Sequence, residues 1–155
     1  MTGWVPAVEI IPHQGDSVLI DRVREIDAKR LLATMVVRSG TAFSDSSGCL
    51  PAWIGPEIIA QAISAKSSLK CLRDKGRPAS IGLLLGVRDF RSSVAVFHPG
   101  ESLEIEVIES LDDGEGRAVF DGQNRLRGEQ VAVGILTVFQ AEDDSVIQRE
   151  LNRHA

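Results

Sequence analysis

Glu57 and Gln61 are the residues of this sequence whose types and spacing best suit chemistry. They stand four positions apart in a stretch of small and apolar residues, GPEIIAQAISAK, so a helix would bring both to one face. A carboxyl group among apolar side chains has a raised pKa and can then act as an acid near neutral pH. The alternative is an acid that only stabilises the helix N-terminus, an effect worth roughly 0.3–1 kcal/mol. Gln61 would either orient the carboxyl group or satisfy loop backbone.

His13 is the candidate base, and it follows Pro12 just before an apolar run. An imidazole suits a general base because its ordinary pKa lies close to neutral pH. The alternative is a structural histidine bonded to backbone at the entrance of a strand. We expect His98, in a Phe-His-Pro-Gly turn, and His154, near the chain end, to be structural or solvated. Cys49 has no base beside it in the sequence, so we expect it to take no part in chemistry.

Length and composition indicate an ordinary globular domain. The 155 residues suit one domain spanning 1–155 with a core of its own. Apolar residues make up 43% and charged residues 25%, and a net charge of −5 speaks against a nucleic-acid partner. No apolar run is long enough for a membrane span, and the N-terminus lacks a signal-peptide pattern. The two cysteines form neither a disulfide framework nor a metal-binding spacing. We therefore expect a cytoplasmic protein without a metal or a cofactor.

One helix and several strands must position these residues. The helix is predicted over 56–75, with Pro56 in its first turn and Gly76 as its C-terminal cap. Small residues surround its first half, so other elements should pack closely on several sides. Apolar or alternating patterns predict strands before and after it, over 17–23, 31–37, 81–91, 102–109, 116–126 and 130–140.

The order of these elements predicts the fold class. The run 81–91 is strongly apolar and suits a central strand, and alternation in 102–109 puts apolar and acidic residues on opposite faces. Residues 38–48 are predicted to form a loop, and 142–155 a polar, frayed tail. The economical arrangement is α+β: a curved antiparallel β-sheet wrapped around one long central helix, which is the hotdog fold.

Three segments carry a family resemblance. They are IPHQGDSVLIDRV, LPAWIGPEIIAQA and GLLLGVRDFRSSVAVFHPGESLEIEV, and together they span about Ile10 to Gln140. In this order they resemble the hotdog 3-hydroxyacyl-[acyl-carrier-protein] dehydratases, and most of all the polyene-biosynthesis (ApeP-like) branch, associated with aryl polyene pigment clusters. The fatty-acid dehydratases carry their catalytic histidine in a Gly-His-Phe-Pro-Gly loop before the helix. Here that loop is FSDSSGCLPA and holds no histidine.

The resemblance implies dehydration of a 3-hydroxyacyl thioester to a trans-2-enoyl thioester. His13 would take the C2 proton and Glu57 would protonate the departing hydroxyl. The unpaired N–H groups at the helix N-terminus would hold the thioester oxygen. The segment 14–17 replaces the Arg-Pro-Pro-Met of that branch, so the entrance of the site should differ. The resemblance gives substrate-binding roles to Pro12, Gln61, Ala52 and Trp53, the last being expected in the core or in a tunnel wall.

The resemblance also implies partners. The family pairs such domains into dimers with a continuous sheet, so we expect a homodimer or higher homo-oligomer. His13 would then face the Glu57 of the partner chain, with the strand 81–90 at the interface. An acidic acyl carrier protein would need a basic patch on this acidic chain. The candidates for that patch are Lys66, Lys70, Arg73, Arg88 and Arg91.

Two other functions stay open on the sequence. A hotdog thioesterase could use Glu57 to activate water without any histidine. A non-catalytic partner of an active dehydratase would explain the missing loop histidine and the altered segment 14–17. The sequence does not specify the length of the acyl chain, aryl against aliphatic substrates, or carrier-protein against coenzyme A thioesters.

Overall fold

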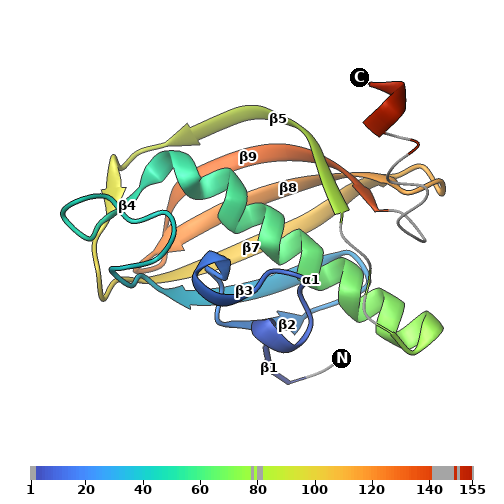
Figure 1. Ribbon diagram of the computed structural model, residues 1–155, viewed down its shortest axis with the longest axis horizontal. Helices are drawn as coiled ribbons and strands as arrows, with labels where there is room; N and C mark the ends of the chain where they lie inside the picture. The colour runs from blue at the N-terminus through green and yellow to red at the C-terminus, as the bar shows by residue number, and fades with distance from the viewer. Residues whose placement is uncertain (1–2, 78, 80–81, 141–148, 150, 155) are drawn as a thin grey trace.

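The computed structural model describes residues 3–77, 79, 82–140, 149 and 151–154. It shows an antiparallel sheet curved around one long helix, which confirms the hotdog fold (Figure 1). The seven strands follow the order β1-β2-β3-β7-β8-β9-β5. Their bounds are β1 Val5–Pro6, β2 Arg22–Glu25, β3 Arg30–Val36, β5 Gly82–Ser92, β7 Ser102–Asp112, β8 Arg117–Leu126 and β9 Glu129–Gln140. Strands β4 Leu50–Pro51 and β6 Val96–Phe97 form a separate pair. The helical elements are three short 3₁₀ turns, η1 Ala7–Glu9, η2 Gly15–Ser17 and η3 Ala52–Ile54, and the helix α1 Gly55–Lys75.

The helix α1 begins and ends where its sequence predicts. Pro56 lies in its first turn, and Gly76 adopts a left-handed φ of 69° while its N–H donates to the carbonyl of Leu72. Small residues on both surfaces let the sheet come close to the helix. A side chain at Gly122 would meet the side chain of Ile59 at 2.4 Å, so only glycine fits there. The helix is therefore held against the middle of the sheet.

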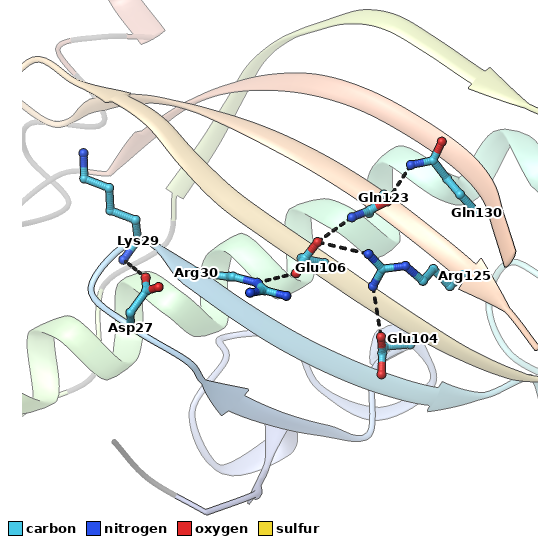
Figure 2. A network of polar contacts seen from close by, with 8 residues as sticks. All are labelled: Asp27, Lys29, Arg30, Glu104, Glu106, Gln123, Arg125 and Gln130. Carbon is cyan, nitrogen blue, oxygen red and sulfur yellow. Dashed lines mark hydrogen bonds and ion pairs between the residues drawn. The ribbon is translucent and has the colours of Figure 1, made fainter. Parts of the chain in front are cut away.

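The predicted alternation along β7 is confirmed. Leu103, Ile105 and Val107 point toward the helix and are at most 1% exposed. The opposite face of the sheet carries a polar network rather than a second apolar layer (Figure 2). Glu106 lies in this network, only 3% exposed, and accepts hydrogen bonds from Arg30, Gln123 and Arg125. These partners satisfy a carboxylate that would otherwise be costly to bury.

Two sequence predictions about strands are wrong. The apolar run 17–23 is not one strand: η2 ends at Ser17 and β2 begins only at Arg22. Leu19 and Ile20 between them are buried, but their N–H groups donate to the side chain of Gln61 instead of to a neighbouring strand. An apolar segment can thus be buried without joining the sheet.

The second correction concerns β5, which lies at the edge of the sheet and not at its centre. It pairs only with β9, and the backbone groups on its other side have no strand partner among the described residues. Leu84, Leu85 and Val87 are 44%, 38% and 40% exposed along this strand. An exposed apolar edge strand is a ready template for pairing with another chain. Of the predicted polar tail, 142–148, 150 and 155 lie outside the described residues. No helix in the described part of the chain is long and apolar enough to span a membrane.

Candidate active site

The Gln61 side chain positions the N-terminal segment against the helix. It is fully buried, and its Nε2 donates to the carbonyl of Ser17 at 2.8 Å while its Oε1 accepts from the N–H of Leu19 at 2.9 Å. These contacts hold the chain just after His13 against the first turns of α1. Both sequence interpretations of Gln61 are therefore observed together, because Nε2 also donates to Glu57 Oε1 at 3.1 Å.

His13 and Glu57 lie side by side within one chain. His13 Nε2 is 3.4 Å from Glu57 Oε1, and the two side chains are 29% and 32% exposed. The expectation that His13 would face the Glu57 of a second chain is therefore wrong. The physical reason is the pair of hydrogen bonds between the Gln61 side chain and the backbone of Ser17 and Leu19, which we call the Gln61 clamp. The clamp brings the N-terminal segment back over the helix of its own chain. The other ring nitrogen of His13, Nδ1, is buried and has no hydrogen-bond partner among the described residues.

The pKa of Glu57 is lowered, whereas the sequence predicted a raised value. Burial raises this pKa, but the hydrogen bonds from His13 and Gln61 and the charge of His13 together outweigh burial. Glu57 is consequently ionised at neutral pH. The ionised carboxylate can stabilise a charged imidazole or activate water. It carries no proton that it could donate to a leaving hydroxyl.

A cavity of about 250 Å³ opens beside this pair. Pro12, His13 and Glu57 lie at one part of its wall. The rest of the wall comes from one face of α1, the start of β5 and the end of β9. Its lining there includes Ala60, Ile63, Ser64, Ser67, Leu83, Leu84 and Val138. The helical members follow Glu57 at steps of three or four residues, and that spacing is the signal by which the sequence could have revealed them.

Ala52 and Trp53 do not line this cavity. The N–H of Ala52 donates to the carbonyl of Ala95 at 2.9 Å, so it is not free to hold a thioester oxygen. Trp53 is 71% exposed in η3, which is inconsistent with a place in the core. One pair was missed: Cys49 Sγ lies 3.5 Å from His98 Nδ1, although the two are far apart in sequence.

Comparison with known proteins identifies the family of this chain. A family model described as ApeP-like, ApeP dehydratase, matches residues 5–149. The chain belongs to the ApeP-like dehydratase family. The match covers His13, Glu57 and Gln61, and so includes the whole candidate site. No curated protein matches the chain by sequence.

Among solved structures, a dehydratase heterocomplex ApeI:P from Xenorhabdus doucetiae has a chain that is 28% identical, with a TM-score of 0.84 over 93% of this chain and 96% of that one. A mutant thioesterase from Pseudomonas aeruginosa is 18% identical, with a TM-score of 0.58 over 79% and 81%. The PaaI protein of the phenylacetic acid degradation operon of E. coli is 11% identical, with a TM-score of 0.57 over 79% of each chain. The last two show the shared fold alone.

Proposed function

We propose that this dehydratase removes water from a 3-hydroxyacyl thioester carried by an acyl carrier protein and yields the trans-2-enoyl thioester. The observation that carries the proposal is the 3.4 Å approach of His13 Nε2 to Glu57 Oε1 at the wall of an apolar cavity. This elimination needs a base for the C2 proton and an acid for the departing hydroxyl, and one histidine stabilised by a carboxylate can serve as both in turn. The likeness to a dehydratase heterocomplex supports the same reaction class.

Because Glu57 is ionised, it stabilises the charged imidazole instead of acting as the acid that the sequence predicted. His13 then serves first as the base and afterwards as the acid. Ionised Glu57 lies 3.4 Å from His13 Nε2 and stabilises the positive charge that the ring gains when it takes a proton. The His13 imidazole takes the C2 proton, the electrons of that C–H bond form the C2–C3 double bond, and the C3–O bond breaks. The imidazolium, stabilised by Glu57, returns the proton to the departing hydroxyl, which leaves as water. His13 and Glu57 end the cycle in their starting protonation states, in the manner of a histidine oriented by a carboxylate.

We propose a second copy of this chain as the partner of β5. The free edge and its apolar side chains suit a sheet that continues into another hotdog domain. Since His13 and Glu57 meet within one chain, each copy would hold its own acid–base pair. A different dehydratase chain is the alternative partner, because the similar structure from Xenorhabdus doucetiae is a heterocomplex.

Among the five cations considered for carrier docking, Arg88 and Arg91 remain available. Lys66 and Lys70 each have a carboxylate at 3.9 Å, and Arg73 pairs with Glu25. Arg88 and Arg91 are exposed on β5 and form no ion pair with a described residue. They are therefore the cations that an acidic carrier protein would meet. The free thiols of Cys49 and Cys71 suit a reducing compartment such as the cytoplasm.

Thioester hydrolysis is the second candidate, because an ionised Glu57 could also activate water. The two reactions differ in their products. We would incubate the protein with 3-hydroxyacyl carrier-protein thioesters and analyse the carrier by mass spectrometry, with free thiol measured in parallel. The proposal predicts loss of one water from the acyl group with no thiol release. Thiol release would favour the thioesterase, and an unchanged carrier in the presence of correctly folded dimer would favour a non-catalytic subunit.

A further inference from the structure

A second cavity, of about 520 Å³, continues the candidate site along α1. Both cavities are lined by Ser67 on the helix and by Val138 near the end of β9. Ser67 lies ten residues after Glu57, which is about 15 Å farther along the helix axis. The two cavities are therefore neighbours, and we call their succession from the His13–Glu57 pair toward the C-terminal half of the helix the track.

Short side chains create this track on one face of the helix. Ala60, Ser64, Ser67 and Cys71 follow Glu57 at steps of three or four residues, so they share a face. The first three line the cavity beside the acid–base pair, and Ser67 and Cys71 line the next. The opposite wall is formed by β5 and β9 in the first cavity and by β7, β8 and β9 in the second.

The two cavities differ in chemistry. Ile63, Leu83, Leu84 and Val138 give the first an apolar wall. The second also has apolar lining residues, among them Phe120 and Phe139, but it adds charged side chains of both signs: Lys66, Lys70, Asp74, Glu109 and Asp112. Lys66 is 3% exposed, donates to the carbonyl of Ala28 at 2.6 Å and lies 3.9 Å from Glu109. An apolar chain that entered this second cavity would displace water from charged groups, which is unfavourable.

Ser67 and Val138 stand where the apolar part of the track ends and the charged part begins. Building on the dehydratase function above, we propose that these two residues set the length of the acyl chain: an apolar chain of medium length lies along α1 with its end between Ser67 and Val138. Val138 packs against the core from β9, so its side chain narrows the track from the sheet side. Ser67 narrows it from the helix side.

The proposal is tested with saturated acyl-pantetheine thioesters from hexanoyl to hexadecanoyl, which lack the 3-hydroxyl and cannot be dehydrated. Calorimetric affinity should rise roughly fourfold per methylene while the chain fills the apolar cavity, and then stop rising at a break. Val138→Ala should move this break to longer chains, and Ser67→Leu to shorter ones. Ser67→Ala, which removes the hydroxyl without filling space, should leave it in place. Val131→Ala is the matched control, since it changes a buried valine of the same strand outside both cavities.

A break that stays at the same chain length in Val138→Ala and Ser67→Leu overturns the proposal, as does affinity that does not depend on chain length. The same series with 3-hydroxyacyl substrates separates this inference from the proposed reaction. If the variants shift the break in binding affinity but no substrate is dehydrated, the dehydratase function is contradicted and the proposal on chain length is supported. If substrates are dehydrated but the break does not shift, the dehydratase function is supported and the proposal on chain length is contradicted.

Discussion

Gln61 and Glu57 are joined by a hydrogen bond of 3.1 Å, and the same Gln61 amide group donates to the carbonyl of Ser17. One buried side chain therefore orients the carboxylate and anchors the segment that carries His13. The distance between His13 and Glu57 depends on this residue, although Gln61 is not part of the cavity lining. It is a positioning residue in the sense that it acts through its two neighbours.

Gln61→Leu should destabilise the fold and weaken the acid–base pair together. The change leaves the buried N–H of Leu19 and the carbonyl of Ser17 without partners, and this should lower the free energy of unfolding by about 2–4 kcal/mol. Urea denaturation measures this change in the free energy of unfolding. Gln130→Leu is the control on the opposite face of the sheet, where the side chain is exposed and the change should stay within about 0.5 kcal/mol. A Gln61→Leu protein as stable as the wild type would contradict the clamp.

The Glu57 carboxyl group should titrate below the ordinary range of a glutamate. Carbon-13 NMR of the side chain measures this pKa directly. In His13→Ala the pKa should rise, because burial of Glu57 remains while a hydrogen bond and a favourable charge are lost. A wild-type pKa above the ordinary range would restore Glu57 as the resting acid.

The lowered pKa also sets how Glu57 affects stability with pH. A carboxyl group whose pKa is lower in the folded than in the unfolded protein stabilises the fold above the unfolded pKa. This stabilisation is lost as the pH falls through the folded pKa. The difference in unfolding free energy between the wild type and Glu57→Gln should therefore shrink on acidification, and a difference that grows would have the wrong sign.

The sequence predicted what depends on local pattern. The helix bounds follow from Pro56 and from Gly76, whose left-handed φ only a few residues tolerate. The faces of β7 follow from strict alternation of apolar and acidic residues. Likewise Glu57 and Gln61 share a face because a helix places residues four apart together.

The sequence could not predict what depends on contacts distant along the chain. Leu19 and Ile20 are buried outside the sheet because Gln61, more than forty residues later, accepts from their N–H groups. The same clamp decides that His13 meets the Glu57 of its own chain. The shift in the pKa of Glu57 is downward because of the contact with His13, so the upward shift predicted from the sequence is wrong as well. Strand β5 is apolar like a central strand, yet it lies at an edge of the sheet, and that position depends on which strands pair.

The free edge of β5 should mediate assembly. Leu85→Lys together with Val87→Lys places charges on a partly exposed apolar edge and should convert the dimer to a monomer, as edge lysines oppose strand pairing. Light scattering at micromolar concentration gives the mass. Leu111→Lys is the control, because Leu111 is 60% exposed on β7, which is separated from β5 by β8 and β9. A monomeric wild type would count against the partner proposed for this edge.

The central claim is that His13 and Glu57 of the same chain form one acid–base pair. It is tested most directly with two hybrid dimers, each purified through different tags on its two chains. One hybrid joins a wild-type chain to the double variant His13→Ala/Glu57→Gln. The other joins a His13→Ala chain to a Glu57→Gln chain. The two hybrids contain the same four side chains in different distributions, so differences in folding cannot separate them.

The measurement is dehydration of a 3-hydroxyacyl thioester by each hybrid. A pair within one chain leaves one intact site in the first hybrid, which should keep roughly half of the wild-type turnover. The second hybrid would have no intact site, and its turnover should be lower by about 10²–10⁴-fold. The opposite result, an active second hybrid and an inactive first, would show that the pair forms between chains and would contradict the account.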